Sequence, residues 1–182
     1  MSRFKRMYYQ NAVYHVVVRG NNRQMILKHK SDKIDILASI KKFQERKGFK
    51  LYGFVLMNNH AHFVIEVSAA HNISKVMHAI LLSYSLKYRR KYGYVGHVWQ
   101  GRFHSKPITD DRYILECLRY VHNNPVKAGL ALNPCDYPYS SARFYEGLKS
   151  KGVYEYMDLN RYGDTSVISA DFSKSYLETV PV

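Results

Sequence analysis

Alternation of apolar and polar side chains marks three strands in the first half of the chain. β-Branched and aromatic residues dominate the stretches VYHVVVRG (13–20), LYGFVLM (51–57) and HFVIEV (62–67), and such runs are typical of strands. The polar residues Asn58 and Asn59 join the second and third runs. The sequence therefore predicts a β-hairpin in this region.

Apolar residues repeat at helical spacing in two long stretches. One begins at Ser31, which we expect to be the N-cap, and stops at Gly48. The other runs from about Ile73 to Tyr92, and Gly93 ends it. Each helix has an apolar side that a sheet can cover.

A third helix follows a short extended piece near residues 102–108. We expect this helix to start after Thr109 or Asp110 and to stop at Asn124-Pro125, because proline lacks the N–H that a helix interior needs. The order is then strand, helix, two strands, helix, strand, helix. It predicts an α+β, ferredoxin-like fold: a split β-α-β antiparallel sheet with helices on one face, plus a C-terminal helix.

The chain has 182 residues, which suits one domain with its own core. We assign residues 1–147 to this domain and residues 148–182, where the pattern turns polar and loses its period, to a C-terminal extension. No apolar stretch approaches the roughly 20 residues that cross a bilayer, and residues 1–10 lack the apolar centre of a signal peptide. We expect a soluble, cytoplasmic protein. Cys117 and Cys135 have no zinc-binding spacing and are expected to be small buried thiols.

The charge balance points to a polyanionic partner. The 28 Lys and Arg residues exceed the 14 Asp and Glu residues, which leaves a formal charge of +14. This excess is larger than solubility requires and has the sign that phosphate backbones attract. A nucleic acid is the expected partner.

Two histidines share one side of the third predicted strand. Strand alternation places His60, His62, Val64 and Glu66 on one face. Neighbouring imidazoles on a strand face can converge on one divalent ion. In a chain with 9 histidines, about 0.4 His-x-His triplets arise by chance, so the pair alone does not establish a metal site.

The third helix carries a second set of polar side chains away from its apolar stripe. At helical spacing Tyr113, Glu116, Cys117, Tyr120 and Asn124 lie on one side of this helix. The side chains of Tyr120 and Asn124 are one turn apart, so a phenol and an amide oxygen can act together. The alternative is that Tyr120 is an ordinary amphipathic tyrosine and that Asn124 only precedes the helix stop.

The order of these segments resembles that of the single-tyrosine HUH transposases, in particular the repeat-associated (REP-associated) tyrosine transposase branch. The resemblance extends from about residue 8 to residue 147. It is carried by the stretches VYHVVVRG, GFVLMNNHAHFVIE, GHVWQGRFHS, YILECLRYVHNNPVKAGL and YPYSSARFYEG. It implies that His60 and His62 form the HUH motif and bind a catalytic Mg²⁺ or Mn²⁺, and that Tyr120 is the nucleophile.

The same resemblance implies a reaction and a substrate. The enzyme would cleave and rejoin single-stranded DNA next to a hairpin through a 5′-phosphotyrosine, with no nucleotide cofactor. It also implies a bacterial, nucleoid-associated protein that is a monomer, whereas insertion-sequence relatives are dimers. One alternative is a hairpin-binding protein without chemistry. The other is a replication nickase or relaxase, which the NNPVKAGL context disfavours.

The third metal ligand is a departure from many relatives. They have a glutamine four residues after the nucleophile, and this chain has the shorter Asn124. Glu66 is a competing ligand, although four residues of strand span about 13 Å, which argues against an ion shared with both histidines. His15 is a possible neighbour, but a lone histidine among valines is more often a packed residue.

Basic and aromatic side chains predict the DNA-binding surface, in which phosphates meet the charges and unpaired bases stack on the rings. The alternative for the basic run after residue 88 is that it only complements the dipole of the second helix. The candidates are Arg3, Lys5, Arg6, Arg89, Arg90, Lys91, Trp99, Arg102, Phe103, His104 and Lys106.

Overall fold

The computed structural model describes residues 9, 11–68 and 70–145. Its strands are β1 (Ala12–Arg19), β2 (Lys50–Leu56), β3 (His60–Val67) and β4 (His104–Ile108). Its longer helices are α1 (Lys30–Lys47), α2 (Ile73–Tyr92) and α3 (Asp111–Lys127). Short helical segments are η1 (Asn21–Arg23), η2 (Pro134–Asp136) and α4 (Ala142–Tyr145). The predicted extension over residues 148–182 lies outside the described residues.

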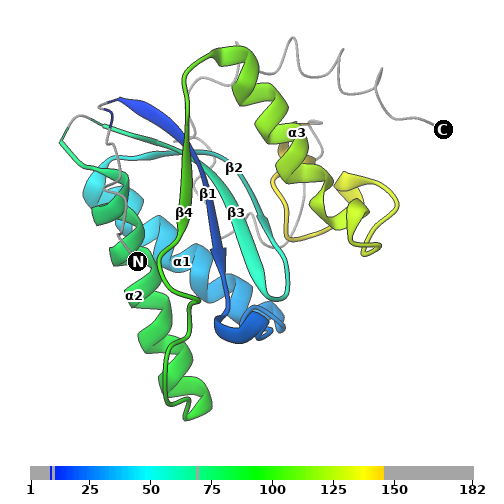
Figure 1. The fold of residues 1–182 in the computed structure, drawn as a ribbon. Helices are drawn as coiled ribbons and strands as arrows, with labels where there is room; N and C mark the ends of the chain where they lie inside the picture. The colour runs from blue at the N-terminus through cyan, green and yellow to red at the C-terminus, as the bar shows by residue number, and fades with distance from the viewer. Residues whose placement is uncertain (1–8, 10, 69, 146–182) are drawn as a thin grey trace.

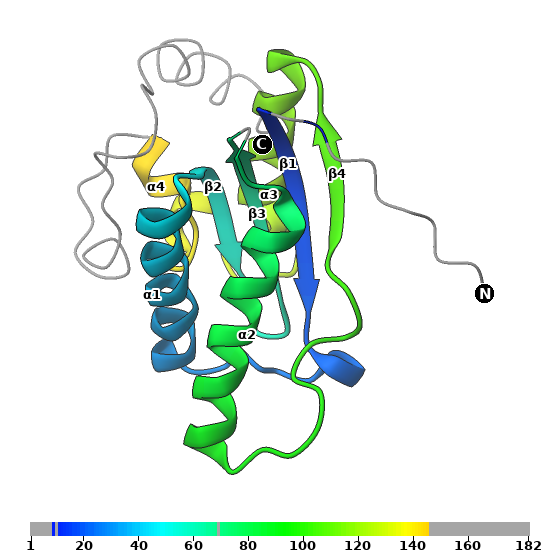
Figure 2. The same cartoon turned by 90° about the vertical axis from the view of Figure 1, so that its left-hand side faces the viewer.

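The four strands form one sheet in the order β2-β3-β1-β4, and every neighbouring pair is antiparallel. Helices α1 and α2 lie side by side against one face of this sheet, and α3 crosses the other face (Figures 1 and 2). This arrangement confirms the predicted ferredoxin-like fold. Because α3 covers the face opposite α1 and α2, each face of the sheet packs into its own hydrophobic cluster.

Strand β3 shows how the sequence divides between these faces. Ala61, Phe63 and Ile65 belong to the core beneath α1 and α2, whereas Val64 packs in the cluster beneath α3. Because side chains alternate along a strand, His60 and His62 share the α3 face with Val64. The face that α3 covers is therefore the face that carries the two histidines.

A glycine lets α3 approach the sheet closely. Gly53 in β2 lies directly beneath α3, where an added Cβ would collide with the Leu118 side chain. Leu118 and Val121 are fully buried, so they anchor α3 to the sheet. Tyr120 lies on the neighbouring side of α3, next to the stripe that packs on the sheet.

The start of α1 differs from the prediction. His29, not Ser31, is the N-cap, because the carboxylate of Asp32 accepts a hydrogen bond of 3.0 Å from the His29 N–H and so satisfies the exposed end of the helix. Gly48 and Gly93 end α1 and α2 as predicted, and both have left-handed backbone angles.

The end of α3 also differs from the prediction. The helix runs through Pro125 to Lys127. Proline supplies no N–H to the carbonyl of Val121, four residues earlier. The Asn124 side-chain nitrogen instead donates to that carbonyl at 3.2 Å and to the carbonyl of Tyr120 at 2.8 Å. The amide thus compensates for the proline, and the predicted stop at Asn124-Pro125 is wrong.

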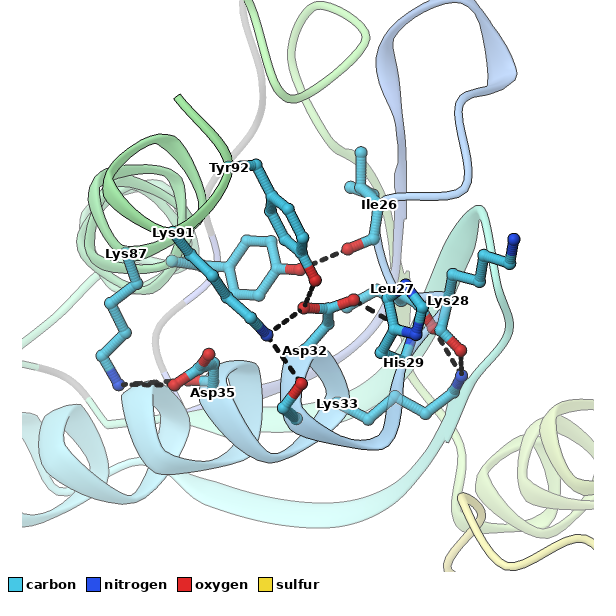
Figure 3. A network of polar contacts seen from close by, with 12 residues as sticks. Ile26, Leu27, Lys28, His29, Asp32, Lys33, Asp35, Lys87, Lys91 and Tyr92 are labelled. Carbon is cyan, nitrogen blue, oxygen red and sulfur yellow. Dashed lines mark hydrogen bonds and ion pairs between the residues drawn. The ribbon is translucent and has the colours of Figure 1, made fainter. Parts of the chain in front are cut away.

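A polar network joins α1 and α2 to the segment before α1 (Figure 3), and one further bond reaches the β2–β3 turn. The buried carboxylate of Asp32, at the start of α1, accepts hydrogen bonds from Lys91 and Tyr92, at the end of α2, both at 2.7 Å. The buried ammonium of Lys33 donates to the carbonyl of Leu27 and, at 3.1 Å, to Asn58 Oδ1 in the β2–β3 turn. These contacts fix the turn from which His60 emerges.

Candidate active site

Three histidines and one tyrosine come together between the sheet and α3. His15 and His62, on the paired strands β1 and β3, have nearly parallel rings with centroids 5.2 Å apart. The ring of His60 lies 5.2 Å from that of His62. Tyr120 of α3 places its ring edge-on, with centroids 5.8 Å from His62 and 5.7 Å from His15. The structure thus brings together the two predicted metal ligands and the predicted nucleophile.

Hydrogen bonds leave the same ring nitrogen available on both predicted ligands. His60 Nδ1 lies 2.6 Å from the side-chain oxygen of Asn59, so it donates a proton to that oxygen. His62 Nδ1 lies 3.0 Å from His15 Nε2. In each case the Nδ1 atom has a partner, and Nε2 is left for a ligand. Metal-binding histidines in proteins are usually held in this way by a second polar group.

The surroundings keep these imidazoles neutral. Burial is the main cause that lowers the pKa of His62 to about 3, and the charges of His15, His60 and Arg19 lower it further. Burial, followed by the charge of Arg19, also lowers the pKa of His60. Burial and Lys106 lower the pKa of His15. Because metal ions bind the neutral imidazole, this electrostatic setting suits a metal site.

The set of residues that could hold a metal ion is limited. Across residues 9, 11–68 and 70–145, no three side chains of the His, Cys, Asp and Glu types are arranged to hold one. The predicted third ligand, the amide of Asn124, is of another type. Its nitrogen is occupied by the helix carbonyls, so its Oδ1 is the atom left to bind a cation. An amide oxygen is a suitable ligand for Mg²⁺ or Mn²⁺.

Glu66, the other candidate for the third metal ligand, has partners away from the histidines. Glu66 accepts a hydrogen bond from the Tyr52 hydroxyl and forms an ion pair of 3.3 Å with Lys50. It pairs across the sheet with Val13, whereas His62 pairs with Val17. Glu66 therefore belongs to the other end of the same strand face.

Tyr120 is accessible to a large substrate. Its side chain is 45% exposed. The ammonium of Lys127, two turns along α3, lies 5.1 Å from the centre of its ring. A cation at this distance interacts favourably with the ring and places a positive charge beside the phenol.

Two clefts border the cluster. One has a volume of about 540 Å³ and lies between β4 and α3, with Tyr120, His15 and Lys106 in its lining. The other has a volume of about 770 Å³ and is lined by Arg19, Arg102 and His104 among others. His104 pairs with Val17 of β1, and Lys106 pairs with His15. These two predicted DNA-binding residues therefore lie on the histidine face, next to the cluster.

Other predicted DNA-binding residues have contacts within the protein. Lys91 donates hydrogen bonds to the side chains of Asp32 and Ser31 at the start of α1, and Arg89 donates to the carbonyl of Gly96. Arg90 lies exposed near them, at the end of α2. This helix covers the opposite face of the sheet from the histidines (Figure 2). The structure thus places the basic end of α2 apart from the cluster.

The two predicted stacking residues are largely covered. Trp99 donates from its indole nitrogen to the carbonyl of Leu81 at 3.2 Å, and its ring packs against Tyr84. Phe103 is 9% exposed and belongs to the core beneath α1 and α2. Trp99 is half-buried, and both residues line a cleft of about 380 Å³ that Arg89 and Arg102 also border. Arg3, Lys5 and Arg6 lie outside the described residues.

Sequence reasoning gave His15 too little weight. As a lone histidine among valines it matched a packed residue, and its partner His62 is 47 positions away. The strand register that brings the two rings together was not readable from the alternation of either strand. Arg19, which pairs with His60 across the sheet, was missed for the same reason.

A family model for the IS200-like transposases matches residues 8–124. The chain belongs to the IS200-like transposase family. The matched segment of this transposase includes all four cluster residues, His15, His60, His62 and Tyr120, and ends at Asn124.

Individual relatives agree with this assignment. A Haemophilus influenzae protein named "Putative REP-associated tyrosine transposase" is 40% identical over 65 residues, a segment that is 36% of this chain and 35% of that protein. The matched region thus spans about a third of that relative. A REP-associated tyrosine transposase solved bound to a REP hairpin superimposes with a TM-score of 0.69 and 22% identity, covering 82% of this chain and 89% of that one. The resemblance seen in the sequence is confirmed.

The described part of this transposase contains no helix with the length and apolar character needed to span a bilayer.

Proposed function

We propose that this IS200-like transposase cleaves and rejoins single-stranded DNA beside a hairpin, with the Tyr120 oxygen as the nucleophile. The observation that carries the proposal is the position of Tyr120. Its ring lies against His62 and His15, yet its side chain is 45% exposed. A phosphate can therefore reach the phenol and the histidines together.

The reaction is a balanced exchange of phosphodiester bonds. The Tyr120 oxygen forms a bond to phosphorus, and the bond from phosphorus to the 3′-oxygen breaks. The phenolic proton leaves to a base or to water, and the 3′-oxygen takes up a proton to become a free hydroxyl. The 5′-phosphate stays on the tyrosine. Attack by a 3′-hydroxyl on this phosphotyrosine reverses the step and rejoins the strand, so no nucleotide cofactor is required.

The histidines fit a divalent cation. A bound Mg²⁺ or Mn²⁺ would supply positive charge that offsets the charge on the scissile phosphate. His60 and His62 would hold it through Nε2, with the Oδ1 of Asn124 as a third ligand. This requires an unprotonated Nε2 on His62, so His62 Nδ1 carries the proton and donates to His15 Nε2. In this arrangement His15 is a positioning residue for His62.

The DNA would lie along the charged edge of the same sheet face. Arg19, Arg102 and His104 line one cleft, and Lys106 lines the other. The +14 formal charge of the chain favours a phosphate backbone as the partner. The REP-associated transposase of the same fold is bound to a REP hairpin, and we propose a DNA hairpin with single-stranded flanks as the ligand of this chain.

Covalent capture tests the proposal. The protein is incubated with Mn²⁺ and a library of labelled hairpin oligonucleotides with random flanks, and adducts are resolved by denaturing electrophoresis. We expect an adduct that Tyr120→Phe abolishes. Tyr139→Phe is the matched control, because it removes a phenolic hydroxyl outside the cluster. An adduct that persists in Tyr120→Phe would show that another residue is the nucleophile. Hairpin binding by the parent without any adduct would favour a binding protein without chemistry.

A further inference from the structure

The cleft between β4 and α3 has a chemistry that the transfer reaction itself does not use. We propose that this cleft is a nucleobase subsite: it holds one unpaired base next to the scissile phosphate and selects against thymine. The proposal rests on the proposed function, in that the strand must reach Tyr120 for its neighbouring base to enter the cleft.

One side of α3 forms a wall of this cleft. Tyr113, Glu116, Cys117 and Tyr120 follow one another at helical spacing, and all four line it. Its volume of about 540 Å³ is in the range of small-ligand sites. Since Tyr120 is part of this wall, an occupant of the cleft lies beside the nucleophile.

The walls suit a flat apolar ring. Pro107 and Ile108 of β4 also line the cleft. Tyr113 is 59% exposed, so its ring is available for stacking on a base. Burial raises the pKa of Cys117 to about 11, so its thiol is neutral near pH 7. These surfaces add no charge to the middle of the cleft.

Two opposite charges define the polar contacts of an occupant. Glu116 and Lys106 both line the cleft, but the ion pairs found among the described residues do not join them to each other. A carboxylate repels a phosphate and accepts hydrogen bonds, so an N–H group of the occupant suits the position beside Glu116. The ammonium of Lys106 needs an acceptor. A nucleobase offers donors and acceptors on one edge.

This pair distinguishes among the bases. Adenine, cytosine and guanine present an amino group, which can donate to the Glu116 carboxylate. The edge of thymine has one N–H between two carbonyl oxygens, and a carboxylate repels both oxygens. Polar base contacts of this kind discriminate by about fivefold or more. We therefore expect thymine to be the base that the cleft excludes.

Selection from a random pool tests this subsite without cleavage. The full-length protein is equilibrated in EDTA with hairpin oligonucleotides that carry four random nucleotides on each flank, and the bound fraction is sequenced. We expect thymine to be depleted about fivefold or more at one flanking position. Glu116→Gln should remove most of that depletion, because an amide can donate to a carbonyl oxygen. Glu45→Gln, which makes the same charge change on α1, is exposed and should leave the depletion unchanged.

A second variant tests the stacking wall. An abasic nucleotide at the selected position should weaken binding by the parent, whereas Tyr113→Ala should bind the intact and abasic oligonucleotides about equally. Uniform base use at every flanking position, or a thymine depletion that Glu116→Gln leaves intact, would overturn the proposal, as would a pool that the protein does not retain. If thymine is depleted but no covalent adduct forms, the transfer reaction is refuted and the base subsite stands.

Discussion

Asn124 has a structural task in α3 besides its proposed role at a metal ion. Its side-chain nitrogen donates to the carbonyls of Tyr120 and Val121 at 2.8 and 3.2 Å. The Val121 carbonyl has no N–H from Pro125 to accept. Replacing Asn124 by alanine leaves it without a helix donor and loosens the turn that carries Tyr120. The predicted consequence is a lower free energy of unfolding.

The magnitude follows from the two bonds. Each is worth about 0.5 to 1.5 kcal/mol, and the half-buried position favours the lower end, so the loss of both bonds should cost about 1 to 2 kcal/mol, less roughly 0.5 kcal/mol for the better helix propensity of alanine. Asn123→Ala is the matched control. Asn123 makes one such bond, to the carbonyl of Arg119 at 3.0 Å, and no proline deprives that carbonyl of its own N–H. Both variants gain the same helix propensity, so the larger loss expected for Asn124→Ala reflects its second bond, to the carbonyl that Pro125 leaves without a donor.

Urea denaturation followed by circular dichroism measures both variants. A double-mutant cycle makes the test specific, because Pro125→Ala restores an N–H to the Val121 carbonyl. Asn124→Ala should then cost about 0.5 to 1 kcal/mol less in the Pro125→Ala background than in the parent. Equal losses for Asn124→Ala and Asn123→Ala, together with no coupling in the cycle, would refute this account of α3.

Two further predictions concern His15 and His122. His15→Phe keeps an aromatic ring beside His62 but removes the hydrogen-bond partner of His62, so the Mn²⁺ affinity measured by calorimetry should fall about tenfold. The control His78→Phe, on the exposed side of α2, should leave the affinity unchanged. Equal affinities for the parent and His15→Phe would rule out the positioning role. Burial lowers the pKa of His122 to about 3, so in the folded state it stays neutral while the unfolded chain takes up a proton below pH 6.5. Stability from this residue is therefore fully present above pH 6.5 and is lost as the pH falls toward 3, by about 1.4 kcal/mol per pH unit. Between pH 7 and pH 5 the parent should lose about 2 kcal/mol more unfolding free energy than His122→Gln, and parallel pH profiles would contradict this assignment.

Local pattern was enough to predict most of the fold. The run of β-branched residues in β1, the glycines that end α1 and α2, and the alternation along β3 each depend on neighbours within a few positions. The two misplaced ends depended on side chains instead. Asp32 supplied the cap that shifted the start of α1, and Asn124 supplied the donors that carried α3 past Pro125. Neither bond changes the hydrophobic period, so periodicity did not reveal them.

The candidate site divides in the same way. The shared face of His60 and His62 followed from strand alternation, and the exposure of Tyr120 beside the apolar stripe followed from helical spacing. The partnership of His15 with His62 required the register of β1 against β3. The commitment of Lys91 to Asp32 likewise required the packing of α2 on α1, since side-chain charge alone does not distinguish a DNA contact from an internal ion pair.

The sequence by itself therefore determined the elements, the two faces of each strand and the chemical character of the site: a pair of imidazoles, one phenol and an excess of positive charge. Tertiary structure alone decided that α3 crosses the histidine face of the sheet, that His15 joins the cluster and that a cleft opens beside Tyr120. The physical reason is the range of the interactions along the chain. Alternation and helical period are set by backbone geometry over a few residues, whereas ring contacts and clefts depend on distances between segments that only the packed core fixes.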